Sequence, residues 1–211
     1  MPVHLVHHGS LAVPRYGEAA YEEAKRYLSR DSVERSLFDR LEHAWGRHFR
    51  LTINHRNDDS FDPASDTIAW DPSSALRTTS GGRQSPALGL GHEIDHAVES
   101  PRLEARLSER SNCRYDTAEE RRVIAGSERH AARTLGEATR EDHMGRCYRV
   151  ASPLSRLRGG MRGFVEQHED RDSKDGCDAV QRLERRVRAS ALDLVNVPHA
   201  QAGIVRKIFL R

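Results

Sequence analysis

The chain is short of the residues that mark several common classes of protein. Its 211 residues include three cysteines, Cys113, Cys147 and Cys177, which are odd in number, far apart and in no C-x-x-C pair. This spacing fits neither a disulfide framework nor a thiolate zinc site, and it favours a reducing compartment. The sequence has no apolar run long enough for a membrane-spanning helix. Residues 1–16 lack a charged start followed by an apolar stretch, so we expect no ordinary secretory signal peptide.

The sequence also has no large excess of charge of either sign. The 34 lysines and arginines are balanced by 32 aspartates and glutamates, for a net charge of +2, and aromatic residues make up only 6%. These values disfavour a nucleic-acid-binding protein, which is expected to carry a basic excess. Hydrophobic residues make up 36% and charged residues 31%. We therefore expect a small core and a charged surface, at a length that suits one domain, with or without an appendage.

The most informative feature that is present is the H-E-x-x-H run His92-Glu93-Ile94-Asp95-His96. On a helix, His92 and His96 would lie on one face, one turn apart, where two imidazoles can hold one Zn²⁺. Glu93 would lie beside them and face the metal's open position, where a carboxylate can act as general base toward a water. The pattern therefore predicts a zinc-dependent peptidase, with His92 and His96 as ligands and Glu93 as the base.

The residues around this motif predict a helix over about 85–99. Apolar side chains recur there with helical spacing, which a fully solvated helix would not need. Ser85-Pro86 supplies an N-cap followed by a first-turn proline, and Pro101 disfavours helix in the residue before it. Gly89 and Gly91 each cost about 1 kcal/mol in a helix interior. We expect them to let another stretch of backbone pack close.

A third metal ligand is expected downstream, because a catalytic zinc usually takes three protein ligands. Glu120 shares a face with apolar residues of a second predicted helix, over about 117–139, and that inward face would aim it at a buried metal. Thr117 also makes Glu120 part of a capping box, which would place it there for structural reasons alone. The alternatives to Glu120 as ligand are Glu119, Glu128, His130 and His143.

The remaining pattern predicts further helices and a short sheet. Residues 18–29 keep a helical period, and so does a segment capped by Asp31 or Ser32, whose apolar positions continue to Trp45 and Phe49. Alternating side chains predict strands at 49–54 and 67–70, and an exposed edge there could bind an extended substrate by strand addition. We expect residues 1–16 to be irregular, 57–65 to be rich in turns, 73–83 to be a loop, 140–150 to be polar and mixed, 179–195 to be helical and 204–209 to form a last strand.

Four stretches in and before the predicted metal helix form a recognisable set: Ile68-Ala69-Trp70-Asp71-Pro72, Gly81-Gly82, Ser85-Pro86-Ala87 and Leu90-Gly91-His92-Glu93. With these stretches the chain resembles the NleD-like zinc metallopeptidases, effectors that pathogenic bacteria inject into host cells by type III secretion. Further along, H-E-x-x-H is followed by Ala118-Glu119-Glu120 and Gly126. This order is similar to that of the clostridial neurotoxin light chains, a more distant resemblance. The resemblance covers about residues 67–150.

The resemblance implies a small α+β metallopeptidase core of the gluzincin kind, mainly helical, with a short sheet next to the H-E-x-x-H helix. It implies Glu120 as the third zinc ligand, because the second Glu of the pair binds zinc in the light chains. It also implies that Arg140 helps to stabilise the reacting carbonyl oxygen. His143 stands where the light chains carry a Tyr, and Tyr148 is the alternative for that role.

Together these patterns predict an N-terminal helical segment (1–48) packed on a metallopeptidase core (49–150), followed by an extension of unknown role (151–211). The predicted function is that of a zinc-dependent endopeptidase that cleaves a protein of a host cell. Its setting would be that of a bacterial effector, secreted without a cleavable signal peptide and delivered into the host cytoplasm. An antibacterial toxin domain and a non-catalytic binding module that contains zinc are the alternatives. We expect no nucleic-acid partner and no membrane span.

Overall fold

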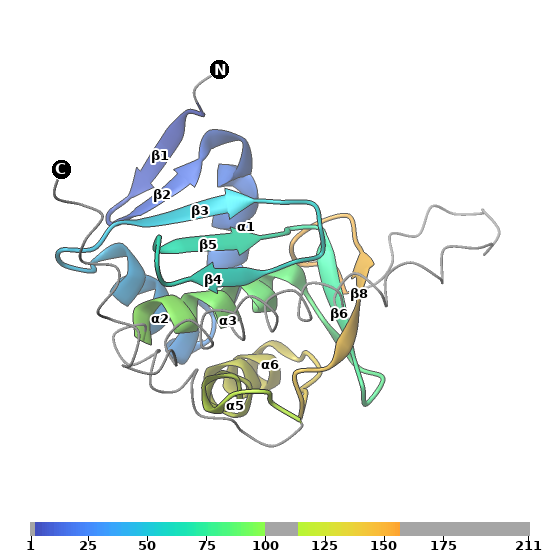
Figure 1. Ribbon diagram of the computed structural model, residues 1–211. Helices are drawn as coiled ribbons and strands as arrows, with labels where there is room; N and C mark the ends of the chain where they lie inside the picture. The colour runs from blue at the N-terminus through green and yellow to red at the C-terminus, as the bar shows by residue number, and fades with distance from the viewer. Residues whose placement is uncertain (1–2, 100–113, 157–211) are drawn as a thin grey trace, which may run out of the picture. The chain divides into compact units, whose positions relative to one another are not determined.

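The computed structural model describes residues 3–99 and 114–156, which all belong to one compact unit of residues 1–173. This part combines two β-sheets with packed helices, so the predicted α+β class is confirmed (Figure 1). Its helices are η1 (Arg15–Gly17), α1 (Glu18–Leu28), α2 (Ser32–Glu42), α3 (Pro86–Glu99), α5 (Ala118–Val123), the π-helical segment η3 (Ile124–Glu128) and α6 (Arg129–Leu135). Its strands are β1 (Leu5–His8), β2 (Leu11–Pro14), β3 (Phe49–Ile53), β4 (Ser60–Asp62), β5 (Thr67–Trp70), β6 (Ser74–Thr78), β7 (Arg83–Gln84) and β8 (Gly145–Arg149).

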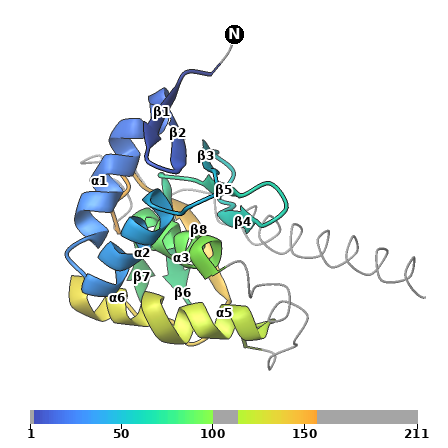
Figure 2. The ribbon, with the colours of Figure 1, turned by 90° about the vertical axis from the view of Figure 1, so that its left-hand side faces the viewer.

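The main sheet has five strands in the order β1-β2-β3-β5-β4. β2, β3 and β5 run parallel, whereas β1 and β4 are antiparallel strands at the two edges. Side chains alternate between the two faces: Leu51 and Ile68 are paired in register and buried, while the neighbouring Arg50 is exposed. Helices α1, α2 and α3 lie on one face of this sheet, as the two views show (Figures 1 and 2). The core therefore lies between the sheet and these helices.

The prediction of irregular structure over residues 1–16 is wrong, because β1 and β2 occupy much of this stretch. β1 pairs with β2, and β2 pairs in parallel with β3, so the predicted helical segment 1–48 also supplies two strands of the main sheet. Gly9 makes the tight turn between them at φ +58°, in the left-handed region that favours glycine. Neither strand alternates apolar and polar residues, since their sequences are LVHH and LAVP, so no period of two can be recognised there.

A second, three-stranded antiparallel sheet has the order β7-β6-β8. β6 and β7 form a hairpin within the predicted loop 73–83, so that prediction is wrong. Gly81, at φ +87°, lies in the turn that joins them. The longer partner of β6 is β8, which follows it by about 70 residues and falls in the stretch expected only to be polar and mixed. This pairing depends on a distant segment and leaves no local signal.

Helix α2 begins as predicted and ends earlier than expected. The Asp31 carboxylate caps it by accepting hydrogen bonds from the backbone N–H groups of Val33 (2.9 Å) and Glu34 (3.1 Å). The helix ends at Glu42, and Trp45, which fits its apolar period, is fully exposed. Helical spacing beyond Glu42 was therefore coincidental.

Helix α3 confirms the predicted helix that carries the H-E-x-x-H motif. It contacts α1, α2, α5, β4, β5 and β6 and is buried on nearly every side. At its start the Leu88 N–H donates to Ser85 Oγ (3.3 Å), and the indole N–H of Trp70 donates to the carbonyl of Pro86 (2.8 Å). Leu90 and Ile94 are fully buried in the core. The motif therefore stands on a rigid central element.

The two glycines of α3 make room for acidic side chains rather than for backbone. A Cβ at Gly91 would lie 2.4 Å from Glu34 Oε2, and a Cβ at Gly89 would lie 2.7 Å from Asp59 Oδ2. Glu34 is fully buried, and neither of its carboxyl oxygens has a hydrogen-bond partner among the described residues. A buried and unpaired carboxyl group favours its neutral, protonated form.

Glu34 is expected to make the protein less stable as the pH rises. Burial, together with the charges of Asp95, Asp31 and Glu128, raises the pKa of Glu34 from 4.5 to about 8, although the charge of His92 lowers it in part. Between these pH values the folded state keeps a proton that the unfolded state has lost. The free energy of unfolding should therefore fall by on the order of 3–5 kcal/mol across this window. Glu34→Gln is neutral at every pH and should remove this part of the dependence in urea unfolding measured from about pH 4 to 9.

Asp39→Asn is the matched control for this measurement, because Asp39 lies on the exposed side of the same helix. Its unfolding should follow the pH dependence of the unmodified protein. Equal pH dependence of the Glu34→Gln variant and the unmodified protein would show that Glu34 ionises normally.

Candidate metal centre

Helix α3 brings His92 and His96 together on one buried face. Their Nε2 atoms are 3.0 Å apart, and the two rings meet edge to face at an interplanar angle of 83°. The residues are only 5% and 6% exposed. The helical spacing alone accounts for this arrangement, as the sequence pattern predicts.

The helix predicted over 117–139 is broken into α5, η3 and α6. Gly126 has non-helical backbone angles (φ −102°, ψ −108°), and this kink separates Glu120 from Glu128. In a straight helix these two residues would be about 12 Å apart along the axis. Both nevertheless contact the ring of His92, one at each nitrogen. α6 ends with Gly136 in the left-handed conformation.

Glu120 occupies the position expected of a third ligand. Its Oε2 lies 3.2 Å from His92 Nε2, and its Oε1 lies 3.4 Å from His96 Nε2. Thr117 caps α5, as predicted, because its hydroxyl accepts from the backbone N–H of Glu120 (3.1 Å). The carboxylate of Glu120 points to the histidines instead of back to the cap. The three residues His92, His96 and Glu120 could together hold a metal ion.

The chemistry of these atoms fits a cation. The Nδ1 atom of each histidine faces a carboxylate, which can only accept, so Nδ1 carries the proton and Nε2 keeps its lone pair. Two lone pairs and a carboxylate that face one another repel unless positive charge lies between them, either a proton on an Nε2 atom or a metal ion. Glu120 Oε2 is buried and has no hydrogen-bond partner among the described residues. A tetrahedral Zn²⁺ would separate its ligand atoms by roughly 3.3–3.4 Å. The two Nε2 atoms are 3.0 Å apart, and each lies 3.2–3.4 Å from one oxygen of Glu120, Oε2 for His92 and Oε1 for His96.

Two of the alternative ligands hold the histidines instead. Glu128 Oε2 accepts from His92 Nδ1 (2.8 Å), and Glu119 Oε1 accepts from His96 Nδ1 (3.1 Å). Such carboxylates orient ligand histidines and select their tautomer. Both acids are almost completely buried, with at most 2% of their surface exposed. The structure therefore assigns Glu128 and Glu119 as the acceptors for the Nδ1 atoms of His92 and His96.

Two arginines neutralise these two acids. Arg122 donates to Glu119 (2.6 Å) and to Asp95 (2.8 Å), and Arg140 donates to Glu128 through Nε (2.8 Å) and Nη2 (2.7 Å). Although burial raises the pKa of Glu128, its contacts with Arg140 and His92 lower it much more. Glu128 therefore stays ionised near neutral pH and keeps accepting the hydrogen bond from His92.

Glu93 lies on α3 directly after His92 and is 7% exposed. Burial raises its pKa above the ordinary value of 4.5, while His92 and His96 lower it in part. A glutamate with a raised pKa takes up a proton more readily than an exposed one. This environment suits the predicted role of Glu93 as general base.

The structure also places the other predicted site residues. Arg140 bonds Glu128 and lies 3.1 Å from His92 Nδ1, whereas its Nη1 has no hydrogen-bond partner among the described residues. His143 Nε2 lies 3.3 Å from Glu120 Oε2, and its Nδ1 lies 3.2 Å from Asp116. Both residues therefore border the cluster. Tyr148 donates to the carbonyl of Arg156 (2.7 Å), and His130 contacts Asp31, so neither joins the ligand set.

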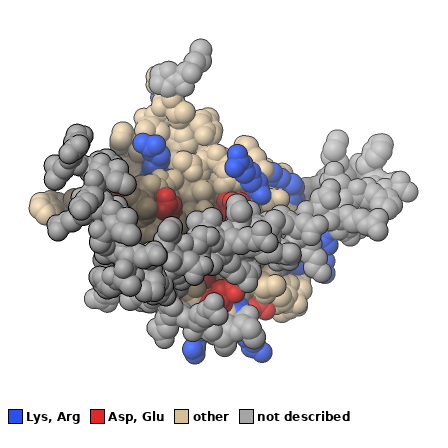
Figure 3. Space-filling model, in the orientation of Figure 1, with Lys and Arg blue, Asp and Glu red and all other residues tan. Residues whose placement is uncertain are grey.

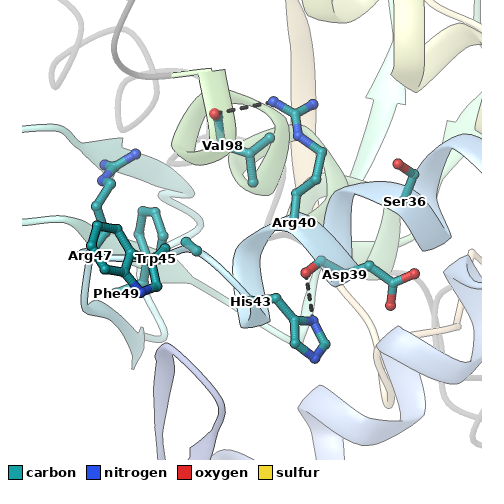
Figure 4. A pocket seen from close by; sticks show the side chains of 9 residues that line it. Ser36, Asp39, Arg40, His43, Trp45, Arg47, Phe49 and Val98 are labelled. Carbon is teal, nitrogen blue, oxygen red and sulfur yellow. Dashed lines mark hydrogen bonds between the residues drawn. The ribbon is translucent and has the colours of Figure 1, made fainter.

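A groove of about 580 Å³ lies elsewhere, beside the end of α3 (Figure 4). Arg40 donates to the carbonyl of Val98 at its rim, and the guanidinium of Arg47 lies 4.3 Å from the centre of the Phe49 ring. None of the predicted catalytic or metal-binding residues lines it. The lining residues are Ser36, Asp39, Arg40, His43, Ala44, Trp45, Arg47, Phe49 and Val98.

The described surface shows no dominant charge on the face seen in Figure 3, where small groups of basic side chains alternate with acidic ones. Among residues 3–99 and 114–156, every helix is too short or too polar to cross a membrane. The predicted strand 204–209, the predicted helix 179–195, Cys113 and Cys177 lie outside the described residues.

Comparison of the chain with protein-family models, with curated proteins and with solved structures finds no match. The argument about function therefore depends on the residues of this chain and on the geometry of the cluster.

Replacement of Glu120 is expected to remove bound metal. Glu120→Ala should reduce the Zn²⁺ content, measured by mass spectrometry after dialysis, from about one ion per chain to a small fraction of that, because two histidines alone hold zinc weakly. Glu119→Gln keeps all three ligands and should bind Zn²⁺ about 10–100-fold more weakly. Glu141→Gln, at an exposed position, is the control. Full metal content in Glu120→Ala would identify another residue as the third ligand.

Metal binding near neutral pH is expected to release protons. Burial lowers the pKa of His92 and of His96, but the neighbouring carboxylates outweigh this effect and raise both. Without metal the pair therefore holds additional proton charge, which must leave when the Nε2 atoms become ligands. Calorimetry of Zn²⁺ binding in buffers of different ionisation enthalpy should show the release of at least about one proton.

Glu128→Gln should release fewer protons in the same experiment, because it removes one of the charges that raise the pKa of His92. A binding enthalpy that does not depend on the buffer would show that both histidines are already neutral before metal binds.

Proposed function

We propose that the protein is a zinc-dependent endopeptidase with a metallopeptidase core of the gluzincin kind. The observation that carries this proposal is the meeting of three side chains: the Nε2 atoms of His92 and His96 and the carboxylate oxygens of Glu120 lie 3.0–3.4 Å from one another. Glu93 directly follows His92 on the same helix. Carboxylate, imidazole and a neighbouring buried glutamate are the groups that metal-assisted peptide hydrolysis requires.

The residues would divide the work as follows. His92, His96 and Glu120 would hold the ion, and zinc in this position acidifies a water molecule and polarises a peptide carbonyl. Glu93 takes the proton of the attacking water and passes it to the leaving amine. Glu119 and Glu128 keep the two imidazoles in the tautomer that leaves Nε2 free to bind.

Arg140 and His143 are the proposed donors to the oxyanion that develops during attack. The support for His143 is its position, because its Nε2 lies 3.3 Å from Oε2 of the proposed ligand Glu120. Arg140 is engaged with Glu128, so its main contribution is to fix that carboxylate, and only Nη1 remains to face a substrate. Donors that are held in place in this way stabilise developing charge without reorganising.

The biological setting we propose is that of a bacterial effector acting on a protein inside a host cell. Its support is the resemblance to the NleD-like metallopeptidases over residues 67–150. An antibacterial toxin domain would use the same chemistry on a bacterial protein, and a binding module would hold zinc without cleaving. A search for new protein N-termini after expression in host cells and in bacterial cells separates these three settings.

Glu93→Gln is expected to abolish cleavage while the metal stays bound. The amide is close in size to the carboxylate but cannot accept the proton, so the rate of cleavage should fall by about 10²–10⁴-fold or more. The measurement compares new N-termini in treated lysates and Zn²⁺ content for the purified variants. Glu99→Gln is the control, because Glu99 lies at the end of the same helix and pairs with Arg40.

Activity that persists in Glu93→Gln would exclude Glu93 as the base. A tightly bound zinc together with no cleavage by the unmodified protein would favour the non-catalytic binding module.

A further inference from the structure

Asp59 lies where the edge of the main sheet meets the H-E-x-x-H helix. It directly precedes β4, which is the last strand of the sheet and pairs only with β5 among the described residues. β4 contacts α3 and is the strand drawn nearest to it in Figure 1. The strands first predicted to bind substrate, 49–54 and 67–70, are interior strands β3 and β5, so β4 is the edge that is open to an extended peptide near the cluster.

The carboxylate of Asp59 is held in one orientation. Its Oδ1 accepts a hydrogen bond from the backbone N–H of Asp71 (2.7 Å). Its Oδ2 lies 2.7 Å from the point where a Cβ of residue 89 would stand, so only a glycine there allows this approach. Gly89 therefore lowers the stability of the helix, but it allows a carboxylate to pack against the surface of α3.

The Asp59 carboxylate lies against the turn of α3 that the Glu93 side chain is expected to cover. Side chains on a helix lean toward its N-terminus, so Glu93 covers the turn that contains Gly89, four residues earlier. Burial raises the pKa of Asp59 well above its usual value, and the charge of Glu93 raises it further, although the backbone hydrogen bond from Asp71 lowers it. Among the described residues, no Lys or Arg forms an ion pair with Asp59 or with Glu93.

We propose that Asp59 makes the enzyme select substrates that place a cationic group next to the scissile bond, an inference that depends on the proposed peptidase function. A peptide that lies along β4 and passes Glu93 would bring an adjacent side chain to Asp59 Oδ2. A Lys or Arg side chain there would supply positive charge that lowers the raised pKa of Asp59 and lets it ionise beside Glu93, so that a charged pair forms with the substrate. A free N-terminal amine offers the same charge, so the test separates the two sources.

Asp59→Asn is the informative variant. The side-chain oxygen of asparagine can still accept from the Asp71 N–H, so the local fold is kept while the charge is lost. Asp58→Asn is the matched control, because Asp58 is the neighbouring acid and the close contacts at the glycines of α3 involve Asp59 and Glu34 instead. Circular dichroism and Zn²⁺ content should be unchanged in both variants. Asp59→Ser serves as a second variant if Asp59→Asn does not fold.

The experiment digests a peptide library that retains internal Lys and Arg with the zinc-loaded protein and sequences the new termini. We expect Lys or Arg to be enriched at one fixed position within two residues of the cut for the unmodified protein and for Asp58→Asn. Asp59→Asn should reduce this enrichment about tenfold or more, because the charge pair forms in a desolvated site. Cleavage of peptides with acetylated N-termini, with the same preference, would identify a side chain rather than the terminal amine as the cation.

Cleavage by the unmodified protein without a basic preference overturns the proposal, and so does an equal preference in Asp59→Asn. Cleavage that requires a free N-terminus would retain Asp59 as the selecting residue and identify the amine as its ligand. If the zinc-loaded unmodified protein cleaves no peptide, the proposed peptidase function fails, and this inference fails with it.

Discussion

The mutual repulsion of two imidazole lone pairs and one carboxylate, held within 3.0–3.4 Å of one another, is the constraint on which the rest of this structure depends. Such an arrangement persists only if each group is fixed from behind and positive charge, a proton or a metal ion, can occupy the space between them. Glu119 and Glu128 fix the rings through Nδ1, and Arg122 and Arg140 balance the charges that this requires. Removing one partner of a buried ion pair costs several kcal/mol, typically about 3–5, so the ligands and the ions behind them form one unit.

Acidic side chains pack against helix α3 at both of its glycines. Glu34 and Asp59 reach its backbone at the two glycines, where any larger residue would exclude them. On one side this leaves a buried neutral carboxyl group beside Gly91, and on the other a second carboxyl group beside Gly89. The two glycines thus weaken the helix but allow Glu34 and Asp59 to approach the candidate metal centre. This arrangement links the stability of the fold to the electrostatics of the site through the same helix.

Two of the three residues that could hold a metal were predictable because they follow the spacing of a helix. His92 and His96 need only a helix to meet, and the apolar period with the Ser85-Pro86 start was sufficient to predict that helix. Glu120 was favoured over Glu119 and Glu128 by its place on a helical face and by the resemblance. Which acid would hold which histidine could not be predicted, because the contact depends on a kink at Gly126 that has no strong signal beyond a glycine in a helical pattern.

The sequence by itself determined the helices α1, α2 and α3, the strands β3 and β5, and the position of the cluster on α3, since each follows from contacts between residues a few positions apart. Tertiary structure alone decided the placement of β1, β2 and β4 around the main sheet, the pairing of β6 with β8, and the approach of Asp59 to Gly89. These features depend on pairing between segments far apart in the chain, and β1, β2 and β4, which show too little alternation of their own, acquire their identity from the strands with which they pair.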